Sequence, residues 1–286
     1  MARKPDTRAV GLDVGLAFIK WLTGAENLHY GLWDGLEVTA ANLRRAQDAY
    51  TEKLFRLLPE GRLRILDIGG GAGETAKKLL ALDHEVEIVV PSAFLASRCR
   101  ENAPGARVHE CRFEDFEGEG GFDICLFSES FQYIPVAIAL EKSSALLKDG
   151  GEIIIADCFR SDAFSAGGTK ATVGGGHHVR RFLSTLEAMP LEILHEKDIT
   201  ASVAPSVELE QGFFNVLGYG IGRVDEELAR SRPKLRWALH RAMRLLLSER
   251  KRARLDQRFN QRTRTAEAFE KYNRYLMLKL GVRRRG

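Results

Sequence analysis

Five short apolar runs constrain the fold of this chain most strongly. They cover residues 63–68, 86–90, 107–111, 122–127 and 152–156. Apolar residues do not alternate with polar ones in these runs, so both faces of each strand are expected to be buried. The intervening segments have helical spacing at 76–81, 93–102 and 135–147. Buried strands that alternate with helices predict an α/β fold with a doubly wound parallel sheet, covered on both faces.

The rest of the chain is expected to elaborate this core. Apolar residues three to four apart predict an amphipathic helix over 37–58, and a loop is expected over the glycine-rich residues 161–178. A helix at 179–189 and a strand at 191–199 follow, then helical spacing over 200–270 and a strand at 275–280. We expect four parts: a helical N-terminal cap (1–60), the core (61–200), a helical lid insertion (201–270), and a last strand with a basic tail (271–286).

Composition places the chain among globular proteins. With 286 residues, 44% of them hydrophobic and 29% charged, it can bury a core, and disordered, collagen-like and disulfide-scaffold classes are excluded. No window approaches 18 uninterrupted apolar residues, and no signal peptide is expected. The four cysteines lack metal-ligand spacing, so we expect no metal site and a reducing, cytoplasmic location.

Charge is distributed unevenly along the chain. Residues 231–286 contain 18 Lys and Arg against 4 Asp and Glu, a net charge of +14, whereas the preceding residues sum to −10. A basic helix that is simply solvated would account for this surface. Attraction for an anionic substrate, an anionic membrane surface or nucleic acid would account for it equally.

The glycine-rich turn after the first apolar run is the most informative motif. In LRILDIGGGAGETAKKL, Gly69, Gly71 and Gly73 permit a sharp turn into a helix whose N-terminal amides face a ligand. A dinucleotide fingerprint would need a glycine at position 74, which is Glu74. The Asp67 carboxylate would repel a pyrophosphate, but it can bind the ammonium group of an amino-acid moiety. The loop therefore favours S-adenosylmethionine over a dinucleotide.

Three motifs in register resemble those of class I S-adenosylmethionine-dependent methyltransferases. LDIGGGAG at 66–73 resembles the first motif, FDICLFSES at 122–130 the fourth-strand motif, and LLKDGGEI at 146–153 the turn into the fifth strand. HYGLWD at 29–34 and KDIT at 197–200 are similar to segments of the sterol, tocopherol and cyclopropane-synthase-like small-molecule group. The resemblance implies a Rossmann-like, seven-stranded sheet whose last strand is antiparallel and lies beside the fifth.

The resemblance also implies the cofactor-binding residues. They are Tyr30, Asp67, Gly69, Gly70, Gly71, Ser92, Phe113, Glu114 and Ser128. Two positions depart from the family pattern. Val90 stands where an acidic residue normally binds the ribose hydroxyls, and Arg112 stands where an aspartate normally meets the adenine edge. Ser92 and nearby backbone are expected to compensate for the first, and the Phe113 backbone N–H and ring for the second.

Methyl transfer requires alignment of the acceptor, exclusion of water and stabilisation of positive charge. Tyr30 and Trp33 from the cap, and Tyr133 after the fourth strand, are the expected lining residues, with packing as their alternative role. Glu129 is expected to orient an amine or hydroxyl, or else to cap the following helix. His178, at the end of the glycine-rich loop, is a candidate general base or a plain surface residue.

We therefore expect a methyltransferase that acts on a small molecule such as a lipid, isoprenoid, polyketide or sugar-derived metabolite. This acceptor is expected to be anionic or membrane-associated. An RNA-modifying methyltransferase is an alternative suggested by the basic tail, although no RNA-binding module flanks the core. A non-catalytic binding or scaffold protein that kept the fold is another. The sequence does not identify the acceptor atom or the oligomeric state.

Overall fold

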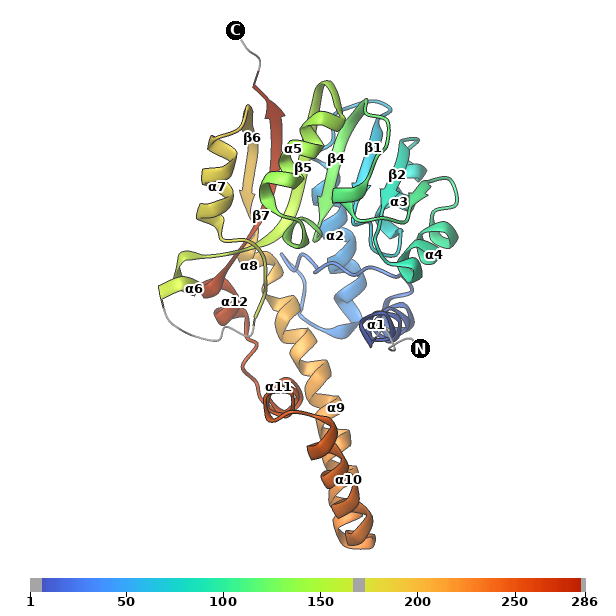
Figure 1. The fold of residues 1–286 in the computed structure, drawn as a ribbon, viewed down its shortest axis with the longest axis vertical. Helices are drawn as coiled ribbons and strands as arrows, with labels where there is room; N and C mark the ends of the chain where they lie inside the picture. Colours follow the sequence, from blue (N-terminus) through green and yellow to red (C-terminus); the bar gives the residue numbers. More distant parts are fainter. Residues whose placement is uncertain (1–6, 167–172, 284–286) are drawn as a thin grey trace.

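The computed structural model describes residues 7–166 and 173–283, in which seven strands form one sheet (Figure 1). The strand order is β3-β2-β1-β4-β5-β7-β6. Strands β1 to β5 are parallel, whereas β7 pairs antiparallel with both β5 and β6. The expected seven-stranded sheet with an antiparallel last strand beside the fifth is confirmed. The strands are β1 (Arg64–Ile68), β2 (Glu85–Val89), β3 (Arg107–His109), β4 (Phe122–Ser128), β5 (Leu147–Arg160), β6 (Leu191–Asp198) and β7 (Asn273–Val282).

Both faces of the sheet are apolar because helices cover both. Ile65 of β1 packs in one cluster with residues of α2 and α3, and its neighbour Leu66 packs in a second cluster with residues of α5 and α7. Successive side chains of a strand point to opposite faces, so a strand buried on both sides reads as a continuous apolar run. The covering helices include α2 (Leu43–Phe55), α3 (Glu74–Ala81), α4 (Ala93–Asn102), α5 (Val136–Leu146) and α7 (Val179–Glu187).

Two segments differ from expectation. The helix expected over 37–58 is shorter: it begins at Leu43, after the 3-10 turn η1 (Ala40–Asn42), and ends at Phe55. The loop expected over 161–178 is wrong in its first part, where Asp162–Ala166 form the short helix α6. Its residues 167–172 lie outside the described part of the chain, and residues 173–178 connect to α7 without helix.

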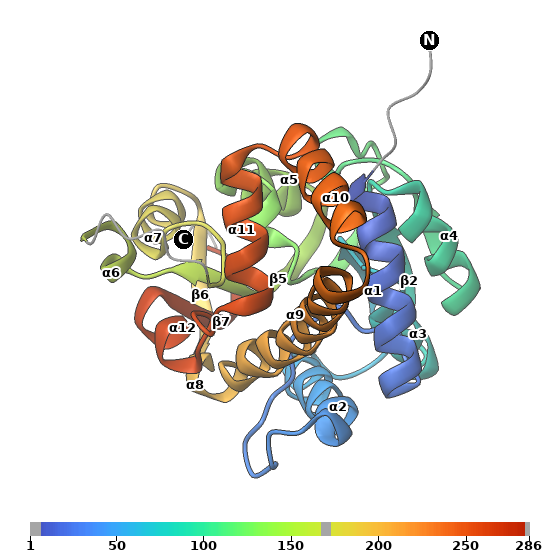
Figure 2. The same ribbon diagram turned by 90° about the horizontal axis from the view of Figure 1, so that it is seen from below.

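The lid is a helical projection from the carboxyl edge of the sheet (Figures 1 and 2). Its helix α9 runs away from the sheet, α10 lies at the far end, and α11 packs across α9. A Cβ atom at Gly218 of α9 would lie 2.2 Å from the Phe259 carbonyl oxygen, so only glycine permits this crossing. None of the helices in 7–166 and 173–283 is long and apolar enough to cross a membrane. The elements are α8 (Thr200–Val203), α9 (Pro205–Ser231), α10 (Pro233–Leu246), α11 (Glu249–Asn260) and α12 (Ala266–Tyr272).

A first helix, α1 (Thr7–Thr23), lies within the helical cap expected over 1–60, although the sequence did not give its bounds. It lies at the same end of the sheet as the lid (Figure 1), and Phe18 stacks on Phe213 of α9 with ring centroids 4.1 Å apart. Glu26, just after α1, is buried and accepts hydrogen bonds from Lys20 of α1 and Arg98 of α4. The cap is therefore fixed to the lid on one side and to the core on the other.

Candidate active site

The glycine loop after β1 has the backbone that the sequence predicts. Gly69, Gly71 and Gly73 have φ angles of +77°, +56° and +88°. A Cβ atom at Gly69 would lie 2.4 Å from the Ser130 Cβ, and one at Gly73 would lie 2.9 Å from the Cys99 Cα. At Gly71 the nearest atom would be Cδ1 of Leu28, at 3.6 Å. Leu28 therefore places the cap over an otherwise open part of the loop.

Asp67 lies beneath this loop, fully buried near the end of β1. Its Oδ2 would lie 2.7 Å from a Cβ atom at Gly70, yet this oxygen has no hydrogen-bond partner among the described residues. Burial raises the pKa of Asp67 to about 7. The carboxyl group thus supports the loop by contact, and one of its oxygens is available to a ligand.

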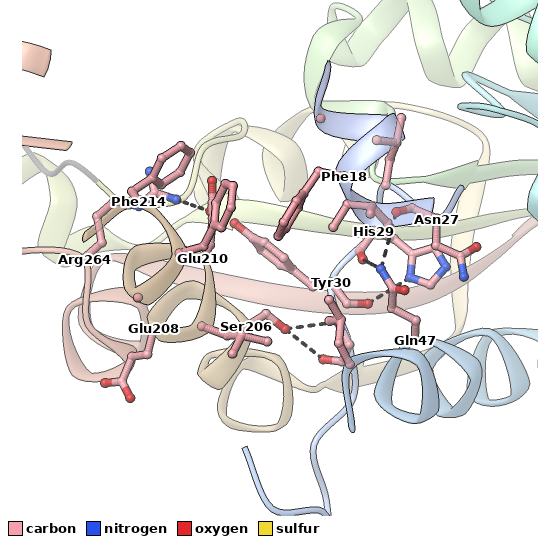
Figure 3. Close-up of a pocket in the computed structure, with 18 of the residues that line it drawn as sticks. Phe18, Asn27, His29, Tyr30, Gln47, Ser206, Glu208, Glu210, Phe214 and Arg264 are labelled. Carbon is pink, nitrogen blue, oxygen red and sulfur yellow. Dashed lines mark hydrogen bonds and ion pairs between the residues drawn. The ribbon is translucent and has the colours of Figure 1, made fainter. Parts of the chain in front are cut away.

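Two further buried amides, in the cap and in α2, each leave one atom without a partner in the described part of the chain. Gln47 of α2 donates from Nε2 to the carbonyl oxygens of His29, at 3.1 Å, and Asn27, at 3.4 Å. Its Oε1 and the Nδ2 of Asn27 are unpartnered among the described residues, and Figure 3 shows both side chains beside His29. Buried polar atoms in proteins are nearly always hydrogen-bonded. Asn27 and Gln47 both line the large cavity described below, so these atoms indicate that a polar group of a ligand can bind at this end of the cavity.

Glu129, immediately after β4, lies where the cap, β4 and β7 meet. It is a non-glycine residue with φ of +56°, a costly conformation that places its side chain toward the cap. Its Oε1 accepts hydrogen bonds from the Tyr30 N–H at 2.7 Å and the Tyr275 hydroxyl at 2.9 Å. Burial raises the pKa of Glu129 to about 8, although both hydrogen bonds lower it. The carboxyl group can therefore exchange a proton near neutral pH.

A row of hydroxyl groups leads from Ser128 to this carboxyl. The Tyr275 hydroxyl is 2.9 Å from that of Tyr50, which is 3.2 Å from the Ser128 Oγ. When Glu129 is ionised, Tyr275 donates to it, so Tyr50 must donate to Tyr275 and Ser128 to Tyr50. The row joins α2, β4 and β7 and holds the carboxyl in place.

A cavity of about 1250 Å³ opens beside Glu129. One end is lined by aromatic rings of α1, α9 and α11, including Phe18, Phe214 and Phe259. The ring of Tyr30 extends across the cavity with its hydroxyl directed toward Glu210 and Phe214 (Figure 3). Burial raises the pKa of Tyr30 well above its ordinary value, so the phenol stays protonated. The cavity therefore offers a mainly apolar space with a carboxyl and a phenol on its walls.

Ion pairs on the lid close one side of this cavity. Glu210 of α9 accepts hydrogen bonds from Arg264 at 2.5 Å and Arg258 at 3.4 Å, and all three residues line the cavity. They join α9 to α11 and to the segment that precedes α12. These charged side chains lie next to the aromatic end, so the part of the cavity lined by the lid is polar at its edge.

The structure brings some of the expected site residues together and leaves others apart. Tyr30, Glu129 and Tyr133 line the cavity, although Tyr133 is 69% exposed. His178 starts α7, with its ring centroid 5.7 Å from that of Phe164, and does not line the cavity. Trp33 is buried and donates from Nε1 to the Ser206 Oγ at 2.8 Å, so it ties the cap to α9.

The residues expected around the adenosine part lie along the carboxyl edge of the sheet and make structural contacts. Ser92 caps α4 by accepting from the Leu95 N–H at 3.4 Å. The ring of Phe113 is buried against Phe127, and the Glu114 carbonyl oxygen accepts from Lys142. None of these side chains lines the large cavity. Their role toward a cofactor remains a prediction.

His29 contributes packing and not a charge. It is buried, its ring stacks on Tyr50 at 4.5 Å, and its Nδ1 lies 2.8 Å from the Tyr30 carbonyl oxygen. Burial lowers the pKa of His29 to about 4, so the imidazole is neutral at physiological pH. Among residues 7–166 and 173–283, no cluster of three His, Cys, Asp or Glu side chains is arranged to hold a metal ion.

Four residues of the site had no sequence signal that singled them out. Asn27 and Gln47 belong to segments that the sequence describes only as cap and amphipathic helix. Tyr50 and Tyr275 read as core residues, and their hydroxyl contact joins positions 225 residues apart. An apolar pattern identifies their buried faces but not the partner of each hydroxyl.

Comparison with known proteins agrees with this architecture. Residues 65–151 match the family described as a methyltransferase domain. That segment begins in β1, contains the glycine loop and Glu129, and ends within β5. This part of the core is therefore similar to a methyltransferase domain.

Solved structures resemble the chain over nearly its whole length. A geranyl diphosphate methyltransferase in complex with geranyl diphosphate and sinefungin aligns at 18% identity and a TM-score of 0.65, covering 93% of this chain and 92% of the other. A geranyl diphosphate C-methyltransferase from Streptomyces coelicolor A3(2) aligns at 16% identity and 0.64, covering 99% and 100%. The (4+2)-cyclase SpnF aligns at 17% identity and 0.65, covering 98% and 97%. At these identities the likeness concerns the fold, including the cap and lid.

Proposed function

We propose that this protein transfers a methyl group from S-adenosylmethionine to a small, mainly apolar acceptor bound in the cavity beside Glu129. The observation that carries the proposal is the junction of two features. The glycine loop, with the unpartnered Asp67 carboxyl beneath it, meets the cap at Leu28, and Leu28, Asn27 and Gln47 of the cap and α2 also line the large, mainly apolar cavity. A cofactor and an acceptor would meet at this junction.

The residues at the loop fit S-adenosylmethionine, the cofactor of this domain family. The unpartnered Oδ2 of Asp67 and Oε1 of Gln47 can accept from an ammonium group, and Nδ2 of Asn27 can donate to a carboxylate. Gly71 leaves its backbone open to close approach. When bound, the cofactor supplies an activated methyl group on a sulfonium ion. Its amino-acid part would lie among these three side chains.

Glu129 is proposed to manage the proton of the acceptor. Its Oε1 is used by Tyr30 and Tyr275, whereas Oε2 has no hydrogen-bond partner among the described residues. A carboxylate whose pKa is close to 8 can accept a proton near neutral pH and hold it away from water. His178 lies away from the cavity lining, so Glu129 is better placed than His178 for this role.

The lining favours a lipid or isoprenoid acceptor over a sugar-derived one. Phe18, Phe213, Phe214 and Phe259 form an aromatic end that offers little hydrogen bonding to a sugar, and the charges at its margin, Arg258 and Arg264, are paired with Glu210. Two structural neighbours are named for geranyl diphosphate, whose geranyl part is an apolar isoprenoid chain. The HYGLWD segment supports membership of the sterol, tocopherol and cyclopropane-synthase-like group.

A second candidate function is catalysis in the same cavity without methyl transfer. The neighbour SpnF is named as a cyclase although it has the same fold. In that case a cofactor bound at the loop would only stabilise the protein. The cavity would hold the substrate in the conformation from which its ring closes.

Isotope transfer would separate the two candidates. We would incubate the purified protein with methyl-labelled S-adenosylmethionine and a panel of prenyl diphosphates, fatty acyl and polyketide acceptors, and detect labelled products by mass spectrometry. Label should appear in an apolar acceptor and should be lost in Glu129→Gln. Cofactor binding by calorimetry without transfer to any acceptor would favour the second candidate.

Binding at the loop has its own test. Gly71→Val places a branched side chain in a positive-φ position at the open part of the loop and should abolish cofactor binding. Gly150→Val is a matched control, because Gly150 also has positive φ, +77°, with nothing within 4 Å of a Cβ atom. Unchanged binding in Gly71→Val would refute the proposed cofactor site.

A further inference from the structure

Helix α10 is packed on α9 through its polar side. Asp225 of α9 accepts hydrogen bonds from the Arg236 Nε and Nη2, at 2.9 and 2.8 Å, and from the His240 Nε2 at 2.7 Å. Arg236 and His240 are the two residues of α10 that are half-buried, and all others in this helix are exposed. A helix on a protein surface normally turns its apolar side inward. Helix α10 instead leaves its apolar residues exposed: Leu235, Leu239 and Met243 by 44–47%, and Trp237, Leu245 and Leu246 by 65–80%.

Helix α10 lies at the far end of the projection (Figure 1), and its apolar side chains are exposed there. Leu235, Leu239 and Leu246 follow at intervals of four and seven residues, which places them on one side of a helix. Leu245 and Leu246 are 79% and 80% exposed. Exposed apolar surface of this kind marks an interaction site in a soluble protein.

Helix α10 also carries cations without acidic partners among the described residues. Lys234, Arg241 and Arg244 of α10 are exposed and make no ion pair with described residues. Arg241 lies over the ring of Trp237, which is 65% exposed. The next helix, α11, adds exposed cations that are likewise unpaired among the described residues, such as Arg250, Lys251 and Arg254.

We propose that α10 docks this protein on an anionic membrane surface. Leucines that enter the boundary of the acyl chains, a tryptophan at headgroup level and unpaired cations on the same helix are the features of an interfacial amphipathic helix. The charges select this occupant over a second copy of the chain. Two copies of α10 facing each other would bring their unpaired cations together, whereas anionic headgroups neutralise them.

The docked face is continuous with the proposed catalytic cavity through α9. Val216 and Leu217 of α9 line the cavity and are themselves exposed. Helix α9 leads directly from these residues to α10. An apolar acceptor taken from the membrane would then reach the cavity from the side of the lid.

The docking test uses the full chain and floated vesicles of defined composition. We expect binding to anionic vesicles of phosphatidylcholine that contain about 30–40% phosphatidylserine. Binding to vesicles of phosphatidylcholine alone should be much weaker. Leu245→Ser with Leu246→Ser should weaken binding to the anionic vesicles at least about tenfold. Leu82→Ser with Ile138→Ser, two exposed apolar residues of the core, is the matched control and should leave binding unchanged.

A second variant tests the charges independently. Lys234→Ala, Arg241→Ala and Arg244→Ala together should weaken binding by roughly fivefold for each cation removed and should flatten its dependence on salt. Arg56→Ala with Arg62→Ala, two exposed arginines between α2 and β1, should not.

Equal binding to neutral and anionic vesicles, or full binding by the leucine variant, would overturn the proposal. A dimer in solution that the leucine variant converts to a monomer would overturn it in favour of a second copy. Cofactor binding in all variants is measured separately, because it tests the proposed function alone.

Discussion

The Tyr30 backbone N–H donates to Oε1 of Glu129 across 2.7 Å and so joins the cap to the end of β4. These residues lie 99 positions apart in the chain. The contact uses backbone and not the phenol, so the ring of Tyr30 remains directed into the cavity. The cap therefore fixes one oxygen of Glu129 and supplies a cavity wall with the same residue.

Glu129→Gln should remove the proton acceptor while keeping the volume of the side chain. We expect the turnover rate to fall about 10²–10⁴-fold, the usual contribution of a general base, with cofactor affinity little changed. In the native protein the rate should rise with pH through about 8, because the reactive form is the carboxylate. Steady-state kinetics over pH 6–9 measure both effects. A Gln variant with the native rate would exclude Glu129 from proton transfer.

Tyr275→Phe should shift that pH profile without abolishing activity. The Tyr275 hydroxyl donates to Glu129 and lowers the pKa of the carboxyl, so its removal should move the rate profile to higher pH. Tyr272→Phe, three residues earlier at the end of α12, is the control and should leave the profile in place. A lower rate with an unchanged profile would mean that Tyr275 acts only through packing.

Glu26→Gln should loosen the cap. Burial disfavours the ionised carboxyl, but hydrogen bonds from Arg98, Lys20 and Asn102 lower the pKa of Glu26 from 4.5 to about 2. Its contribution to the free energy of unfolding is therefore full above pH 4.5 and is lost as the pH falls toward 2. At neutral pH we expect a loss of about 1–3 kcal/mol and weaker cofactor binding.

The control for this change is Glu101→Gln. Glu101 also pairs with Arg98, but its side chain is exposed, so its loss should cost little. Thermal unfolding at pH 7 and pH 3 measures the difference. If the Glu26 variant matches the native protein at pH 7, the ion pairs of Glu26 do not hold the cap.

Trp33→Phe should weaken the junction of cap and lid. The change removes the hydrogen bond to Ser206 and keeps most of the buried aromatic surface. We expect a loss of about 1 kcal/mol in stability and a higher KM for the acceptor, with cofactor affinity preserved. Trp21→Phe, in the exposed part of α1, should change neither quantity. An equal effect of the two substitutions would contradict a specific role for Trp33.

The strands and the glycine loop were predictable because their signals are local. A strand buried on both faces reads as an apolar run, and the left-handed turns at Gly69, Gly71 and Gly73 require residues without a Cβ atom. The bounds of helix α1 were missed because its apolar residues surround the helix: Leu16 is buried, whereas Val14 and Trp21 are exposed. Without a single apolar side, periodicity does not locate such a helix.

The site was predictable only where a motif fixes a position relative to the sheet. Glu129 follows the fourth strand, and its place at the carboxyl edge follows from that register. The partners that set its pKa come from β7 and from the cap. Tertiary contacts of this kind leave no trace in spacing, and the displacement of His178 from the cavity has the same origin.

The position of β7 between β5 and β6 also bears on how the chain folds during synthesis. β5 has one neighbour, β4, until residues 273–282 have left the ribosome, and β6 has none before then. The whole lid emerges before the strand that completes the sheet. A nascent chain that stops short of Asn273 therefore presents a long apolar edge on β5, open to pairing with other chains. Chaperone capture of stalled chains should accordingly end when β7 is released.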